Sequence, residues 1–290
     1  MKRTALILAI VLIFGAFAVG CGTTEPAAST SPEVSPSSEV SPSTLPSEAP
    51  EPPAQTGELE QTTFTVGFDN SFPPMGFVDD DGNNVGFDLD LAAEVAKRLN
   101  LELKLQPIAW DSKNMELDAG NIDCVWNGFT ITGRESDYEW TAPYMNNRQV
   151  IVVKGDSAYV GPSELMGKSL ALQKDSSAQA ALDKNAAFKN DITPVYVDDY
   201  LGAFMNLETG AVEGVLVDEI VARYHIEKQQ ANFKILDDAL ASEEYGVGFK
   251  KGNTLLRDKV AAALEEMAKD GSMAAISEKW FGSDITTIGK

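Results

Sequence analysis

The stretch Asp123-Cys-Val-Trp-Asn-Gly-Phe-Thr-Ile-Thr-Gly-Arg134 carries the strongest functional signal in the chain. It begins as an apolar strand, opens at Asn127 and Gly128, and ends on an arginine. A strand that stops exposes its last N–H groups, and Thr130 adds a hydroxyl beside the charged fork of Arg134. Ligands of open α/β sheets bind beyond the carboxyl ends of strands, so we expect a carboxylate site here. The alternative is a strand, a turn and a surface arginine.

The composition limits the classes of function. The 290 residues include 44 acidic and 23 basic side chains, with a net charge of −21. This balance argues against nucleic acid and against an anionic membrane surface as the binding target. Two cysteines and one histidine cannot form a zinc site of the usual spacing, and we expect neither a metal nor a cofactor.

The N-terminal segment, residues 1–20, has the features of a signal peptide. Lys2 and Arg3 precede the apolar run 6–19, which is too short to span a membrane comfortably. The run ends in Ala-Val-Gly-Cys21, which resembles a bacterial lipobox with Ala18 where Leu is most common. We therefore expect lipid on Cys21 to anchor the protein at the outer face of the cytoplasmic membrane. A plain secretory signal or a short membrane anchor is the alternative.

Residues 21–62 are expected to form a disordered tether. They are rich in Ser, Pro, Thr and Glu, with repeats such as Ser31-Pro-Glu-Val-Ser-Pro36, and they contain too few apolar residues to fold. Proline keeps such a segment extended, so it serves as a spacer. If Cys21 carries lipid, Cys124 is the single remaining thiol, and we expect it to be a small core residue.

Alternating strand and helix patterns from residue 63 onward predict two α/β units. An Asp-Gly hairpin turn at 79–84 fails the spacing of a calcium loop. The predicted strands are 64–68, 101–105, 149–154, 169–173, 195–197, 215–217 and 245–249. The first predicted helix is capped by Asp88 and ends at Asn100. The other predicted helices cover 111–119, 178–188, 200–209, 220–229, 256–267 and 272–280.

Asp218 directly follows an apolar strand, where an aspartate is unfavourable unless it is hydrated or paired. It is therefore a candidate for binding a cationic group, for capping the next helix, or for both. Ser176 and Ser177 precede another helix, where serines are caps or anion-binding groups. The only histidine, His225, lies mid-helix, so a Ser-His-Asp site is not expected.

The order of elements over residues 64–282 resembles the family 3 extracellular solute-binding proteins, the polar amino-acid receptors of ABC importers. Seven short motifs in sequence order carry this resemblance. They are Phe72-Pro-Pro-Met75, Gly86-Phe-Asp-Leu-Asp-Leu-Ala92, Leu117-Asp-Ala-Gly-Asn-Ile-Asp123, Gly128-Phe-Thr-Ile-Thr132, Leu165-Met-Gly-Lys168, Val217-Asp218 and Asp270-Gly-Ser272.

The resemblance implies a type II periplasmic-binding-protein-like α/β fold. Two α/β lobes are joined by two crossover strands, near 149–154 and 243–249, and the ligand binds between them. Lobe one then comprises residues 63–150 and 245–290, and lobe two comprises residues 151–244.

The resemblance also implies how an amino acid is held. Arg134, with Gly128 and Thr130, binds its carboxylate, and Asp218 binds its α-ammonium. The other implied ligand-binding residues are Asn127 at the strand end, Ser176 and Ser177 on lobe two, Phe72 and Trp110 around the side chain, and Asp69 at its tip. The turn from Thr130 to Arg134 is one residue shorter than the family pattern, and Asp175 stands where Gly is common.

Asp69 and Trp110 favour a polar or cationic amino acid as the ligand. The expected partners are this amino acid, an ABC permease–ATPase complex and, through the lipid, the membrane. We expect a monomer that binds without turnover. Two alternatives stay open: a ligand-sensing receptor, and a dehydratase-like enzyme that would need an acid/base pair such as Asp69 and Asp218.

Overall fold

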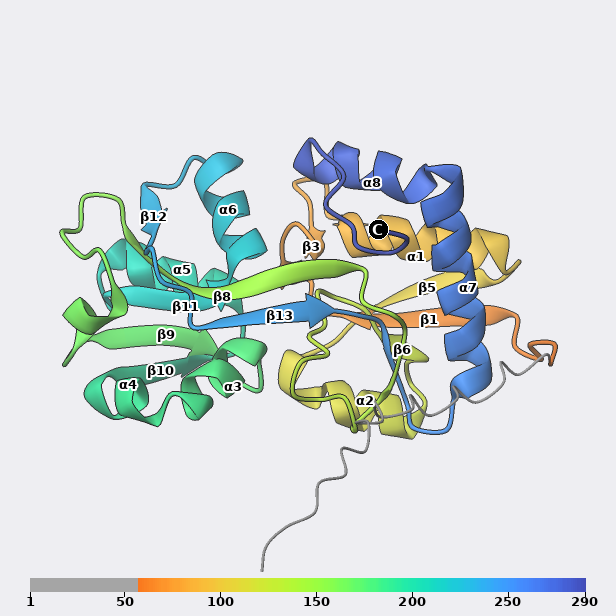
Figure 1. The fold of residues 1–290 in the computed structure, drawn as a ribbon, viewed down its shortest axis with the longest axis horizontal. Helices are drawn as coiled ribbons and strands as arrows, with labels where there is room; N and C mark the ends of the chain where they lie inside the picture. Colours follow the sequence, from red (N-terminus) through yellow and green to blue (C-terminus); the bar gives the residue numbers. More distant parts are fainter. Residues whose placement is uncertain (1–56) are drawn as a thin grey trace, which may run out of the picture. The chain divides into compact units, whose positions relative to one another are not determined.

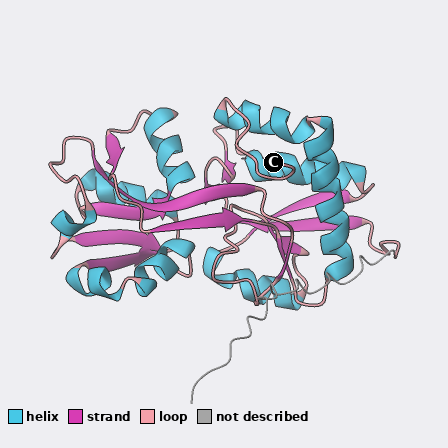
Figure 2. Cartoon of the chain, in the orientation of Figure 1, coloured by secondary structure: helices cyan, strands magenta, loops and turns pink. Residues whose placement is uncertain are grey.

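The computed structural model describes residues 57–290. The predicted signal peptide, Cys21 and nearly all of the predicted tether lie outside the described residues. Across the described range, none of the helices combines the length and the apolar character needed to cross a membrane. The helices and strands form two α/β groups, which we call lobe one and lobe two (Figure 1, Figure 2).

Lobe one contains a five-stranded sheet in the order β5-β1-β6-β14-β7. β1 pairs in parallel with both β5 and β6, whereas β14 runs antiparallel to its neighbours. The strands are β1 Thr63–Phe68, β5 Glu102–Pro107, β6 Cys124–Val125, β7 Glu139–Trp140 and β14 Gly248–Phe249. The predicted Asp-Gly turn joins two strands of a small second sheet, formed by β2 Ser71–Phe72, β3 Gly76–Val78 and β4 Asn84–Val85.

The helices of lobe one bury the apolar faces that the sequence predicts. Leu256, Val260, Leu264 and Met267 are all buried along one face of α7. The helices are α1 Phe87–Arg98, α2 Lys113–Ala119, α7 Thr254–Asp270 and α8 Ser272–Phe281, with a short 3₁₀ helix η1 at Trp110–Ser112.

Lobe two contains a sheet in the order β10-β9-β11-β8-β12, with β13 also paired to β8. Its strands are β8 Met145–Lys154, β9 Ser169–Gln173, β10 Thr193–Val197, β11 Gly214–Asp218, β12 Phe233–Ile235 and β13 Ala241–Tyr245. Its helices are α3 Ser177–Lys184, α4 Ala186–Asp191, α5 Tyr200–Thr209 and α6 Glu219–Glu227, with a 3₁₀ helix η2 at Pro162–Leu165.

Two antiparallel strands, β8 and β13, run from one lobe to the other (Figure 1). Their register pairs Met145 with Tyr245 and Asn147 with Glu243. β8 begins four positions earlier than the predicted strand at 149–154, and after β13 the chain enters β14 in lobe one. The predicted fold class, two α/β lobes joined by two crossover strands, is confirmed.

Three local predictions were wrong. The helix predicted over 178–188 is broken at Asn185, whose side chain caps α4 by accepting a hydrogen bond from the Phe188 N–H. Asp88 does not cap α1, because Gly86 occupies the cap position and the Asp88 carboxylate lies elsewhere in the core. The predicted strand at 245–249 is divided between β13 and β14.

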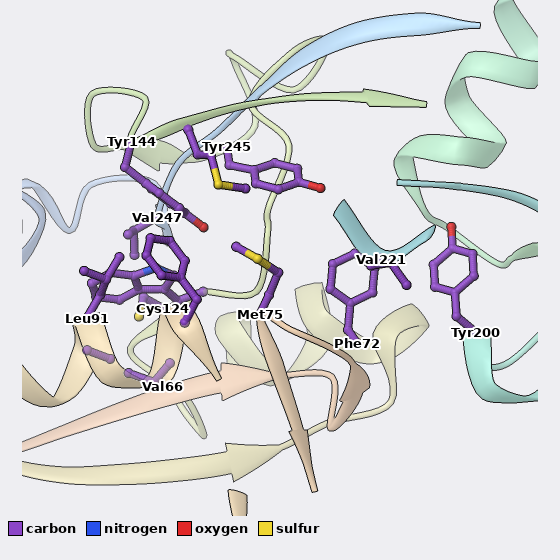
Figure 3. Packing of buried hydrophobic residues seen from close by; sticks show 14 of the residues in the cluster. Val66, Phe72, Met75, Leu91, Cys124, Tyr144, Tyr200, Val221, Tyr245 and Val247 are labelled. Atoms are coloured by element: carbon purple, nitrogen blue, oxygen red, sulfur yellow. The ribbon is translucent and has the colours of Figure 1, made fainter. Parts of the chain in front are cut away.

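A buried apolar cluster extends across both lobes. Figure 3 shows Phe72 of lobe one facing Tyr200 of lobe two, and the centroids of the two rings are 5.7 Å apart. Tyr144 and Tyr245, near the ends of the crossover strands, belong to the same cluster. The cluster brings the polar residues described below to one place.

Candidate functional site

A nearly filled cavity of about 10 Å³ lies between the two lobes. Every residue that the sequence predicts for ligand binding lines it, except Asp69. The lining residues are Phe72, Trp110, Asn127, Gly128, Thr130, Arg134, Gln173, Ser176, Ser177, Tyr200 and Asp218.

The lobe-one wall is the end of the Asp123–Arg134 stretch. Gly128 has a φ of +56°, and a Cβ atom there would lie 3.0 Å from the rings of Phe72 and Tyr245, so glycine is required by both conformation and space. Its N–H donates to the buried Asp88 carboxylate at 2.6 Å and is therefore already paired, unlike the free donor expected from the sequence. The polar atoms left without a partner among the described residues include Thr130 Oγ1 and Asn127 Oδ1.

Arg134 reaches the cavity in spite of the shortened turn. Its N–H closes the turn on the Ile131 carbonyl at 2.8 Å, and its guanidinium donates to the Thr130 carbonyl at 3.2 Å. A weaker bond of 3.4 Å runs to the carbonyl of Asp175 on lobe two. No carboxylate of residues 57–290 forms a salt bridge with Arg134, so its positive charge has no counter-ion from the protein in that range.

The lobe-two wall presents Asp218, which is only 2% exposed. It occupies the cap position of α6 but makes no capping bond with its side chain. Its carboxylate instead accepts hydrogen bonds from Asn147 Nδ2 at 2.9 Å and from the Tyr245 hydroxyl. Burial, followed by the neighbouring Glu243, raises the pKa of Asp218 well above its usual range. Within the described part of the chain, no lysine or arginine pairs with it.

The two serines of lobe two are held by their own lobe. Ser176 caps α3, because its hydroxyl accepts from the Gln179 N–H and donates to the Gln173 carbonyl. Ser177 accepts a hydrogen bond from the Gln149 side chain at 2.9 Å. Both serines line the cavity, so the capping role and a ligand-facing position coexist.

Aromatic rings form the sides of the cavity. Phe72 and Tyr200 approach from opposite lobes, and Trp110 packs edge-on against Phe129 at a centroid distance of 5.5 Å. Trp110 Nε1 is buried and has no hydrogen-bond partner among residues 57–290. A ligand acceptor could therefore bind there.

Asp69 is buried just outside the cavity lining. It accepts hydrogen bonds from the Ser71 N–H at 2.8 Å and from Gln173 Nε2 at 2.6 Å, so it links lobe one to lobe two. Burial raises its pKa above the usual value. The predicted contact of Asp69 with a ligand side chain stays a prediction. Gln173, which bonds to Asp69, lines the cavity, whereas Asp69 does not.

Sequence reasoning missed two lining residues, Gln173 and Tyr200. Gln173 is the last residue of β9, and the rule that identified Asp218 at the end of β11 would also have found it. Tyr200 begins α5 and is completely buried, so in the sequence it looks like any core aromatic residue.

A lysine also bridges the lobes at the rim of the site. Lys113 Nζ donates to the Trp110 carbonyl and, across the cleft, to the Asp175 carbonyl, at 3.1 Å each. Asp175 has a φ of +52°, the conformation that the more common glycine would adopt easily. Burial, together with the nearby Arg134, lowers the pKa of Lys113 to about 8.

Wider hollows occur elsewhere on the described surface. One of about 560 Å³ lies on lobe two and includes His225, which is buried against the ring of Phe204 rather than exposed. Burial lowers the pKa of His225 to about 4. Of the buried polar atoms that lack a partner in residues 57–290, none belongs to this hollow. The interlobe cavity is therefore the better candidate.

Comparisons with known proteins agree with this architecture. The L-cystine-binding protein TcyJ of Escherichia coli (strain K12) is 33% identical over 230 residues, covering 78% of this chain and 85% of that protein. An ABC uptake transporter substrate-binding protein from Streptococcus pneumoniae, solved with bound histidine, has a TM-score of 0.76 and 34% identity, covering 78% of this chain and 95% of that chain. An ancestral arginine-binding protein bound to glutamine has a TM-score of 0.72 and 36% identity, covering 78% of this chain and 100% of that chain. The family model for bacterial extracellular solute-binding proteins, family 3, matches residues 64–283, and the chain belongs to that family.

Proposed function

We propose that this protein captures a free polar L-amino acid between its two lobes and delivers it to an ABC importer. One observation carries the proposal: the same cavity is lined by an arginine without an acidic partner and by an aspartate without a basic partner, within the described residues. Buried or half-buried charges are unfavourable without counter-ions, and a zwitterion supplies both at once. Arg134 binds the carboxylate and Asp218 binds the α-ammonium.

The two charges belong to different lobes, so binding favours closure. A ligand held by Arg134 alone contacts lobe one, and the second ion pair forms only when lobe two approaches. The closed form is selected by the free energy of the contacts that exist only in it. This protein binds its ligand without turnover, as a receptor whose closed form the permease recognises.

The ligand class follows from the cavity and from the relatives. The cavity of about 10 Å³ lies far below the usual range for small-molecule sites of about 300–1,000 Å³, so the lobes have to open to admit an amino acid. Related proteins are named for cystine and arginine, and one was solved with histidine. The free polar atoms at Thr130, Asn127 and Trp110 favour a side chain with hydrogen-bonding groups. A polar or cationic amino acid fits these features best.

The location of the receptor rests on the N-terminal sequence. Lipid on Cys21, after removal of residues 1–20, holds a monomer at the outer face of the cytoplasmic membrane, and residues 21–62 act as the tether. Fractionation of cells that express the Cys21→Ser variant tests this. The variant is expected in the soluble extracytoplasmic fraction, whereas retention in the membrane would contradict the lipid anchor.

Ligand binding is tested by thermal unfolding of the full chain with each of the twenty amino acids and cystine. A ligand at a hundredfold excess over its Kd stabilises the fold by about 2.7 kcal/mol, which raises the midpoint by roughly 5–10 °C. We expect a shift with one or a few polar amino acids, and its loss in Arg134→Ala and in Asp218→Ala. No shift with any amino acid, or a shift with leucine alone, would overturn the proposal.

A further inference from the structure

Behind the cavity wall lies a second buried carboxyl group, Glu243 on the crossover strand β13. It is 6% exposed and does not line the cavity. It lies within hydrogen-bonding reach of Asp218. Asn147 Nδ2 bridges the two carboxyl groups, at 2.9 Å from Asp218 Oδ1 and 2.6 Å from Glu243 Oε1.

The strand register explains why these groups meet. Gln149 on β8 is opposite Asp218 on β11, and Asn147, two positions earlier on β8, is opposite Glu243 on β13. Residues two apart on a strand share a face, so three neighbouring strands place all four side chains together. Gln149 Nε2 also donates to Glu243 Oε1, at 2.8 Å.

The charges around this acid pair do not neutralise it. The facing groups are the hydroxyls of Tyr245 on β13 and Tyr200 on α5, and burial raises the pKa of both tyrosines well above the usual range, so they stay neutral. Glu219, the next residue after Asp218, pairs outward with Arg148 and Arg223. Asp69 adds further negative charge near Tyr200, and Arg134 lies on the opposite lobe.

A separate observation indicates a missing donor at this place. Gln149 is completely buried, and its Oε1 has no donor among the described residues, although its Nε2 makes two bonds. An ammonium group is the kind of donor that this oxygen lacks. Two neighbouring buried carboxyl groups cannot both ionise easily, so a proton is retained on Asp218 beside Glu243.

We propose that Asp218, held beside Glu243 by Asn147, keeps a proton until an α-ammonium binds, and that binding then releases this proton to solvent. The inference rests on the proposed function and adds a role for Glu243, which tunes binding without touching the ligand. The charge balance is simple, since the bound ammonium replaces one proton of the pair. Affinity therefore rises with pH over the range in which the pair holds its proton.

Isothermal titration calorimetry in buffers of different ionisation enthalpy counts the released protons. The titrant is whichever of L-arginine, L-glutamine, L-histidine and L-cystine raises the unfolding midpoint of the full chain most. Between pH 5 and pH 8 we expect a release that approaches one proton per ligand. The Glu243→Gln variant is expected to bind, with its release profile moved to lower pH by about one unit or more.

The matched control is Glu244→Gln, because Glu244 is the next residue on the same strand and is exposed. This control should keep the wild-type profile. Binding without proton release in the wild type, or an unchanged profile in Glu243→Gln, would overturn the inference and leave the proposed function intact. If none of these four amino acids raises the midpoint, the titrant is the polar amino acid with the largest shift in the full set, and the proposed function and this inference fail together only if no polar amino acid raises it. If Glu243→Gln does not fold, the number of protons that the wild type releases per bound ligand decides the outcome.

Discussion

Two aspartates, Asp88 in lobe one and Asp218 in lobe two, have almost the same surroundings by the simplest measures. Both follow a short turn or strand at the start of a helix, both are buried, and each accepts a hydrogen bond from a tyrosine hydroxyl. Burial raises the pKa of both carboxyl groups, for Asp88 to about 7. Neither caps its helix through its side chain.

The partners of the two aspartates separate their roles. Asp88 accepts the N–H of Gly128 at 2.6 Å and the Tyr144 hydroxyl at 2.9 Å, and it does not line the cavity. Asp218 lines the cavity and lies against a second carboxyl group, Glu243. Asp88 therefore fixes the backbone of Gly128, which lines the cavity. Asp218 instead lacks a basic partner among the described residues. Burial and a raised pKa do not by themselves identify a binding residue.

The Asp218→Asn variant should show the largest change in ligand affinity. Removing one member of a desolvated charge pair costs about 2–5 kcal/mol, so the Kd for the amino acid should rise by roughly 30-fold to several thousandfold. The unfolding free energy without ligand should rise at pH 8, because the folded wild type has to retain a proton at Asp218 that the unfolded chain has lost. Calorimetry and urea unfolding measure the two quantities. Asp237→Asn, at an exposed position, is the control, and an unchanged Kd would contradict the assignment of Asp218.

The Asp88→Asn variant should change stability and leave binding nearly intact. The folded pKa of about 7 exceeds the ordinary 3.8, so between these values the folded state binds more protons, and the unfolding free energy falls as the pH rises. The pKa difference corresponds to roughly 4 kcal/mol at most, and asparagine keeps an acceptor for Gly128. We expect the unfolding free energy of the variant, measured with urea, to increase relative to that of the wild type as the pH rises from 4 to 8. If the difference in unfolding free energy between variant and wild type is the same at every pH, the raised pKa of Asp88 is not its cause.

Much of the fold was predictable because the spacing of apolar residues along the sequence indicates which side chains are buried. The face of α7 and the Asp-Gly turn before β4 follow from local patterns. The first four positions of β8 were not predicted, because their buried positions include Asn147, which is polar. A functional network there replaces the apolar alternation that marks a strand.

The candidate site was predictable where a strand end or a motif marked it. Arg134, Thr130 and Asp218 were predicted in this way, and all three line the same cavity. Glu243 and Lys113 were missed, because their importance depends on contacts with residues far away in the sequence. Such contacts leave no periodic signal. The break at Asn185 was also missed, because an alanine-rich run gives no warning of it.

Arg134 offers a test of the other end of the cavity. The Arg134→Lys variant keeps the charge but loses the planar fork that binds a carboxylate with two parallel bonds. We expect a loss of about 1.5–3 kcal/mol, or roughly 10- to 150-fold in Kd. Because Arg134 is less buried than Asp218, this contribution should also weaken with salt, which calorimetry at low and high NaCl measures. Arg148→Lys, on an exposed pair with Glu219, serves as the control. Equal affinity in Arg134→Lys and wild type would exclude bidentate binding.

The smallest predicted effect concerns the Lys113 bridge across the cleft. The Lys113→Met variant keeps the apolar stem but removes the bond to the Asp175 carbonyl, and a single bond of this kind contributes about 0.5–1.5 kcal/mol. We expect the dissociation rate of the ligand to rise about 2- to 10-fold, with little change in the association rate, because the bond exists only when the lobes meet. Stopped-flow fluorescence measures both rates, and Lys104→Met, at an exposed position on β5, is the control.

Lys113 also predicts a pH dependence of opposite sign to that of Asp88. Its folded pKa of about 8 lies below the usual 10.5, so the unfolded chain binds more protons between these values. The unfolding free energy of the wild type should therefore gain a contribution as the pH rises from 8 to 10.5, and Lys113→Met should lack it. If the variant and the wild type keep the same difference in stability across this range, the Lys113 ammonium is not desolvated in the folded protein.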